Sequence, residues 1–145
     1  MLRTPSVAVL LLLAALSTAC GTLRAYSGAP RNPTEVASIR PATVRGHQIL
    51  IESVDGQALN LLQDRAELLP GSHRVRATLV LRTESRLATG THELDFEAEP
   101  GRAYRVHGDW YIYGPRIWIS EDGSEEVLAV AVTRPARPRA VSAGR

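Results

Sequence analysis

The chain contains no lysine and only one cysteine, and the shortage of cysteine limits how its fold can be stabilised. All 17 of its basic residues are arginine. With only Cys20 available, no disulfide can form within the chain, so an apolar core must stabilise the fold by itself. The longest stretch without a polar side chain is ten residues, Val7 to Leu16. A membrane-spanning helix needs about 20 apolar residues, so an ordinary transmembrane anchor is excluded.

Catalytic and metal-binding motifs are also missing. There is no G-x-S-x-G elbow and no glycine-rich phosphate loop. The four histidines lie 26, 19 and 15 residues apart, without the short ligand pairs of zinc sites, and we expect them at strand ends or on the surface: His47, His73, His92 and His107. Ser72 and His73 are adjacent in a predicted strand, so they point to opposite faces and cannot form a nucleophile and its base. The acidic segment 121–126 lacks the alternating ligands of a calcium loop and predicts a solvated turn. We therefore predict no enzyme, no cofactor and no metal.

The net charge of +2 conceals an uneven distribution of charge. Residues 20–133 carry 12 arginines and 15 acidic residues, whereas residues 134–145 carry four arginines and no acid. Nucleic-acid binding requires cations clustered on a folded face, so we exclude nucleic acid as a partner. Residues 134–145 alternate proline and arginine and predict a disordered tail, whose arginines could contact anionic lipid headgroups or lipopolysaccharide.

The first 20 residues have the pattern of an export signal. One positive charge, Arg3, precedes the apolar run, and the small residues Ser17, Thr18 and Ala19 then lead to Cys20. This arrangement resembles the bacterial lipobox, which implies removal of residues 1–19 and a diacylated, usually N-acylated Cys20. Leu16 stands four residues before the cysteine rather than the commoner three. An ordinary signal-peptidase site is the alternative, but it would leave an unpaired thiol.

Lipidation at Cys20 would make a bilayer the first partner of this chain, because two or three acyl chains anchor a protein stably. Gly21 follows the cysteine, where aspartate marks inner-membrane retention in the best-known sorting systems. That resemblance favours the periplasmic face of the outer membrane over the inner membrane. Residues 20–33 are rich in glycine and proline and predict a flexible tether.

Residues 34–133 predict one all-β domain, a small antiparallel β-sandwich of about six to eight strands. Apolar residues alternate with polar ones from His73 to Thr83, and turn signals recur about every 8–12 residues. The only plausible helix is Leu59 to Leu69. If the segments 73–83 and 91–99 form a hairpin over the loop 84–90, two cross-strand ion pairs follow, with Arg74 and Arg76 near Glu99 and Glu97.

Five of the seven aromatic residues lie between Tyr104 and Trp118. Since neighbouring strand residues point to opposite faces, at least two of these rings should leave the core side. Exposed tryptophan and tyrosine favour contacts with sugars or proteins. The alternative is a sandwich with both faces partly covered. The predicted binding surface comprises Trp110, Tyr111, Tyr113, Trp118 and His107.

Two short motifs follow a Val-Asp-Gly turn: L-P-G-x-H-x-V at residues 69–75 and F-x-A-x-x-G-x-x-Y at residues 96–104. They resemble those of small uncharacterised proteobacterial lipoproteins and are similar to PEGA-like and transthyretin-like β-sandwich modules of the cell envelope. The resemblance covers residues 34–133. It implies a β-sandwich and no particular activity, because the motifs encode turns and core positions.

The sequence thus predicts a lipid-anchored envelope lipoprotein that acts as a non-enzymatic accessory or binding module for an envelope protein or a glycan. The alternative is a lipoprotein that binds a small ligand in a pocket at one end of the sandwich, using His107 and the nearby rings. A hydrolase is the alternative of another class. An exposed aromatic or apolar strip along an edge strand would favour the binding module. A concave pocket with converging polar groups would favour the small-ligand-binding lipoprotein. Two histidines close to a carboxylate would favour the hydrolase.

Overall fold

The computed structural model of the chain describes residues 21–60, 62–84 and 87–132, which form two packed β-sheets and no helix. This arrangement confirms the predicted all-β sandwich. The predicted signal segment 1–19, Cys20 and the predicted tail 134–145 lie outside the described residues. Among the residues that are described, no helix is both long and apolar enough to cross a membrane.

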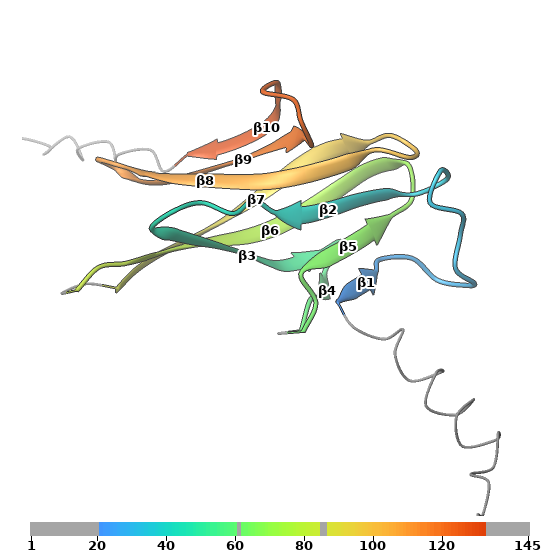
Figure 1. The fold of residues 1–145 in the computed structure, drawn as a ribbon, viewed down its shortest axis with the longest axis horizontal. Helices are drawn as coiled ribbons and strands as arrows, with labels where there is room; N and C mark the ends of the chain where they lie inside the picture. The colour runs from blue at the N-terminus through green and yellow to red at the C-terminus, as the bar shows by residue number, and fades with distance from the viewer. Residues whose placement is uncertain (1–20, 61, 85–86, 133–145) are drawn as a thin grey trace, which may run out of the picture.

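The larger sheet has six strands in the order β1-β5-β2-β8-β9-β10 (Figure 1). Their bounds are Thr22–Arg24 (β1), Arg65–Leu68 (β5), Ala37–Pro41 (β2), Ala103–Tyr111 (β8), Gly114–Glu121 (β9) and Val127–Val132 (β10). The pairs β1–β5 and β2–β8 are parallel, and the other pairs of this sheet are antiparallel. The sheet is therefore mixed, whereas the sequence predicted antiparallel pairing throughout. The parallel pairs arise because β1 and β2, both near the N-terminus, each lie beside a strand from a later part of the chain.

The smaller sheet has four antiparallel strands in the order β4-β3-β6-β7. Their bounds are Gln57–Ala58 (β4), His47–Val54 (β3), Gly71–Arg82 (β6) and Leu87–Ala98 (β7). The tight turn between β3 and β4 uses Asp55 and Gly56 with positive φ angles of 49° and 78°, which is the conformation that Asp-Gly favours. The Asp-Gly turn prediction is thus confirmed.

The apolar residues of the two sheets face each other and form one core. Val75, Ala77 and Leu79 are fully buried, and Val75 and Ala77 alternate with the exposed Arg74 and Arg76, as the period of two predicted. The alternation of exposure ends at Thr78, which is buried although its position in the pattern predicts exposure. The Phe96 ring meets the Tyr104 ring edge-on, with their centroids 5.1 Å apart. From the other sheet, Ile117 and Ile119 complete the core, which closes without any disulfide.

The predicted register of the β6–β7 hairpin is wrong. Arg74 lies opposite Asp95 and Arg76 opposite Glu93, not near Glu99 and Glu97. The Arg74 Nε atom donates a hydrogen bond of 2.7 Å to Asp95. The register differs because β7 begins at Leu87, so the loop is shorter than the predicted 84–90.

The predicted helix from Leu59 to Leu69 is also wrong. This segment forms a turn and then strand β5, in which Ala66 and Leu68 are fully buried and Arg65 is exposed. The alternation of a short strand overrides the weak helical pattern, because these two side chains fill the space between β2 and the other sheet. The described residues form ten strands in all, more than the six to eight predicted.

The domain begins earlier than the sequence predicted. Thr22–Arg24 form β1 beside β5, and Leu23 packs against the core. The Asp64 backbone N–H donates to the Gly21 carbonyl at 3.2 Å, and the Tyr26 hydroxyl donates to Glu67 at 3.2 Å. The segment predicted as a flexible tether therefore contributes a strand to the sheet.

A close approach between the sheets fixes the position of the β8–β9 hairpin. A Cβ atom on Gly90 of β7 would lie 2.1 Å from the Cγ atom of Pro115 in β9. Only glycine allows this contact without a shift of one backbone. The start of β9, and with it the turn that carries the aromatic residues, is consequently held against β7.

Candidate functional site

The β8–β9 hairpin separates the predicted aromatic residues into three environments. Trp110 points inward and packs against the core. Tyr111 and Tyr113 are 49 % and 65 % exposed, and Ile112 between them is 95 % exposed. Trp118 lies on the outer face of the six-stranded sheet, half-buried. The prediction that at least two rings leave the core side is confirmed, and Trp110 is separated from the other rings.

On that outer face, three side chains form a stack that we call the stacked cluster: His107, Trp118 and Arg116. His107 and Trp118 are directly opposite each other on β8 and β9, and their rings are stacked with centroids 5.4 Å apart and an angle of 10°. The Arg116 guanidinium carbon lies 5.3 Å from the Trp118 ring and 6.0 Å from the Tyr111 ring. These are cation–π distances. The cluster thus connects the sheet face to the exposed turn.

Burial holds His107 in its neutral form. Its Nε2 atom lies 2.9 Å from the Ser120 hydroxyl oxygen. Desolvation lowers the pKa of His107, and the charge of Arg105 lowers it further, while Asp122 opposes the shift. A neutral imidazole can lie flat on Trp118 beside the permanently charged Arg116 without repulsion between two cations.

The apolar surface continues from the stacked cluster onto the edge strand β10. Val130 lies opposite Trp118 and is 53 % exposed, and Leu128 and Val127 are also exposed. The segment 127–132 contains no charged residue, although natural edge strands commonly carry charges that discourage pairing with other chains. This exposed strip along an edge strand is the feature that would favour a partner-binding module.

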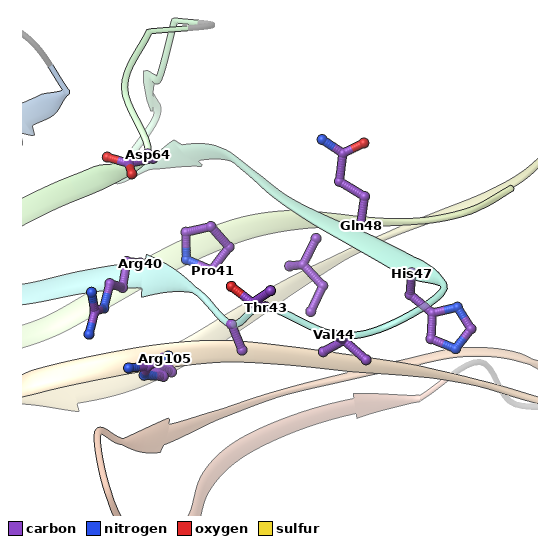
Figure 2. A pocket seen from close by; sticks show the side chains of 10 residues that line it. Arg40, Pro41, Thr43, Val44, His47, Gln48, Asp64 and Arg105 are labelled. Atoms are coloured by element: carbon purple, nitrogen blue, oxygen red, sulfur yellow. The ribbon is translucent and has the colours of Figure 1, made fainter.

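A cleft of about 340 Å³ opens beside the loop between β2 and β3 (Figure 2). Arg40 and Arg105 line one part of it and His47 lies at the far end of the loop. The polar lining does not converge on the empty space, because both guanidinium groups pair with Asp122, at 2.9 Å and 2.6 Å. These two contacts hold the pKa of the Asp122 carboxyl below its usual range, and the contact with Arg105 has the larger effect.

A second cavity of about 420 Å³ adjoins this cleft and shares Pro41, Gln48, Ile49 and Asp64 with it. Neither cavity is lined by His107 or by any of the predicted aromatic residues. These two cavities therefore do not provide the predicted pocket near His107.

His73 lies near the start of β6, in agreement with the expected strand-end position, and its side chain is buried rather than on the surface. Its Nδ1 atom lies 2.6 Å from the Asp55 carboxylate, and its Nε2 atom lies 2.6 Å from the Leu69 carbonyl oxygen. Both of these oxygens are acceptors, so each ring nitrogen of His73 faces an acceptor. His73 thereby fastens the β3–β4 turn to the start of β6. The sequence contained a signal for this burial, because residue 73 shares its parity with the buried Val75 and Ala77.

The remaining chemistry-bearing residues serve the structure. His47 lies 3.3 Å from Asp109 and connects β3 to β8. Residues 121–124 form the predicted turn, in which Asp122 accepts the two arginine contacts. In residues 21–60, 62–84 and 87–132, no three His, Cys, Asp or Glu residues gather in a way that could hold a metal ion. The convergence that would have favoured a hydrolase is absent from this part of the chain.

No protein-family model, curated protein or solved structure matches this chain.

Proposed function

We propose that this chain is a lipid-anchored lipoprotein of the cell envelope, favouring the periplasmic face of the outer membrane, that acts as a non-enzymatic accessory or binding module. Cys20 is its acylation site. The stacked cluster and the strip on β10 form its contact surface for an envelope protein or a glycan. The observation that carries this proposal is the outward-facing stack of His107, Trp118 and Arg116 beside an uncharged, exposed edge strand.

The composition of this surface supports recognition of a partner. Tryptophan, tyrosine and arginine are the residues that most often dominate binding interfaces. Among the described residues, Arg116 forms no ion pair, so its N–H donors remain available to a carboxylate or a hydroxyl group. A flat indole flanked by donors also suits the apolar face of a sugar ring.

The position of the N-terminus supports an anchored arrangement. A single residue, Gly21, separates Cys20 from β1. β1 lies at the opposite end of the domain from the β8–β9 turn (Figure 1). Acyl chains on Cys20 would therefore attach the domain by one end and leave the stacked cluster accessible.

Intact-mass analysis of the protein purified from membranes tests the anchor. We expect loss of residues 1–19 together with the added mass of acyl chains, and we expect neither in a Cys20→Ala variant. A soluble product without lipid would contradict the anchoring part of the proposal, while leaving the surface to be tested separately.

Site-specific photocrosslinking in living cells tests the contact surface. A photoreactive residue at Val130 should capture a partner, whereas the same residue at Leu50 should not. Leu50 is the matched control because it is 43 % exposed on the other sheet. Trp118→Ala should reduce the adduct at Val130. Equal adducts at both positions, or an adduct that Trp118→Ala leaves unchanged, would show that this face is not the contact surface.

A further inference from the structure

We infer that a second surface, at the end of the domain farthest from β1, binds an anionic phospholipid bilayer. We call it the hairpin end and define it by Ile112, Tyr113, Leu87, Arg45 and Arg82. This inference goes beyond the proposed function, because it assigns a different surface and does not depend on acylation of Cys20.

The turns at this end carry exposed apolar side chains where turns usually carry polar ones. Tight turns favour glycine, asparagine, aspartate and serine, yet the β8–β9 turn contains Ile112 and Tyr113, which are 95 % and 65 % exposed. Leu87, the first residue of β7 after the β6–β7 turn, is 64 % exposed. Side chains with this exposure contribute little to the core, so stability of the isolated domain does not explain them.

The turns occupy one end of the domain and are held in place there. Figure 1 shows the β8–β9 turn, the β6–β7 turn and the β2–β3 loop at the same end, with β1 at the other. The contact between His47 and Asp109 connects β3 to β8, and a shallow cavity lined by Gly46 and Arg82 lies between the β2–β3 loop and β6. The apolar tips therefore project from a fixed base.

Positive charge surrounds these apolar tips. Arg45 and Arg82 are exposed and form no ion pair among the described residues, while Glu84 is the one exposed acidic residue in the described part of these turns. The predicted partner of this end is consequently apolar and negatively charged.

An anionic bilayer is apolar inside and negatively charged at its surface, which matches the apolar tips and the surrounding arginines of the hairpin end. Isoleucine can enter the acyl region, while tyrosine favours the headgroup level. Arginine side chains can reach the phosphates, and apolar tips flanked by cations are typical of surfaces that bind membranes peripherally. The β8–β9 turn and the β6–β7 turn lie apart from each other at this end (Figure 1), so a deformable lipid surface can contact both more easily than a rigid partner protein can.

Vesicle co-sedimentation tests this inference with the chain from Gly21 to Arg145. Both sheets and the whole core lie within residues 21–132, so this chain contains the complete fold. We expect binding to vesicles of phosphatidylcholine and phosphatidylglycerol. Ile112→Asp should weaken that binding by about tenfold or more, because it removes one fully inserted aliphatic side chain.

Leu62→Asp is the matched control, since Leu62 is 80 % exposed but lies beside Asp64 and Gly21 near β1. It should leave vesicle binding unchanged. Circular dichroism would verify that both variants are folded, and Tyr113→Ser provides a milder second variant of the tip. Absence of binding by the unmodified chain, or equal losses in Ile112→Asp and Leu62→Asp, would overturn the inference.

A charge variant separates the electrostatic contribution from the apolar one. Each arginine near an anionic leaflet strengthens binding by about fivefold, so Arg82→Glu should weaken binding to phosphatidylglycerol vesicles and lower its salt dependence. Trp118→Ala should not affect vesicle binding. If Trp118→Ala abolishes binding while Ile112→Asp does not, the lipid surface is the sheet face and our assignment of the hairpin end is wrong.

Discussion

Replacing His73 with alanine should destabilise this domain more than any substitution on its exposed faces. The imidazole is only 9 % exposed, and each of its nitrogens lies 2.6 Å from an oxygen of another segment. The Asp55 carboxylate also accepts a hydrogen bond of 2.8 Å from the Arg74 backbone N–H. His73 is therefore one member of a network that joins the β3–β4 turn to β6.

The magnitude follows from the two hydrogen bonds that the variant loses. A hydrogen bond to a charged group contributes about 1.5–3 kcal/mol, and an unpaired buried carbonyl costs about 1–3 kcal/mol. Water can reach part of this site, so we take a value near the lower ends and expect a loss of about 3 kcal/mol. That is a large fraction of the roughly 5–15 kcal/mol by which small domains are stable. It corresponds to a fall in Tm of about 12 °C for a domain of this size.

Thermal and urea unfolding followed by circular dichroism would measure this loss in the chain from Gly21. Ser72→Ala is the control, because Ser72 is the exposed neighbour of His73 on the same strand. His73→Phe retains an aromatic ring beside Phe96, whose centroid lies 6.3 Å from that of His73, but removes both hydrogen bonds. If His73→Phe is as stable as the unmodified chain, ring packing rather than hydrogen bonding holds these turns together, and the reasoning fails.

Three further predictions concern the contacts between strands. Gly90→Ala should lower the free energy of unfolding, measured in urea, by about 2–3 kcal/mol, because the added Cβ would overlap Pro115. A second substitution, Pro115→Ala, should recover part of this loss. A Gly90→Ala variant of normal stability would refute the contact. Burial lowers the pKa of His107, so this histidine binds a proton more readily in the unfolded chain than in the folded one. The free energy of unfolding should therefore fall as the pH drops from above 6.5 to below the lowered pKa of His107. Between pH 7.5 and 5.5, the His107→Gln variant should lose less stability than the unmodified chain. Arg105 is the main cause of the lowered pKa of Asp122. The contribution of Asp122 to the free energy of unfolding is therefore present above the ordinary pKa of aspartate and is lost as the pH falls through the lowered pKa. Asp122→Asn should remove that acid-sensitive part, at most about 1 kcal/mol for so exposed a group, in an acid titration of unfolding.

The sequence predicted those parts of the fold that depend on local patterning. The alternation from His73 to Ala77 and the Asp55–Gly56 turn both appear in the structure where they were expected. Such signals are local, because a half-buried strand and a tight turn each constrain their own residues. The same alternation extends to His73, so its burial could have been predicted from parity alone.

The errors occurred where distant residues decide the local structure. Residues 87–90 were predicted as part of the polar loop 84–90, yet they belong to β7, and Gly90 is required there by Pro115 on the other sheet. Thr22–Arg24 was predicted as a tether because its flanks are rich in glycine and proline, although pairing with β5 makes it a strand. Neither partner can be identified from the segment itself.

The candidate site combines both situations. The outward direction of Tyr111 followed from alternation along β8, whereas Tyr113 is exposed because it lies in the β8–β9 turn. The stack of His107 on Trp118 instead depends on the register between β8 and β9, which the turn at Ile112 sets. A list of aromatic residues therefore could identify the region but could not separate the inward Trp110 from the outward cluster.

An anchor at Cys20 and a lipid-binding hairpin end make a joint prediction about geometry. Only Gly21 separates Cys20 from β1, and β1 lies at the opposite end of the domain from the β8–β9 turn, which contains Ile112 (Figure 1). A bilayer that holds the acyl chains at one end leaves the other end free to contact a second lipid surface. The lipidated protein, reconstituted into neutral vesicles, should therefore aggregate added phosphatidylglycerol vesicles, as measured by light scattering. Ile112→Asp should abolish the aggregation and Leu62→Asp should not. If the lipidated protein binds anionic lipid only when that lipid is in its own vesicle, the domain lies along the surface of one membrane, and the proposed orientation away from the anchor is wrong.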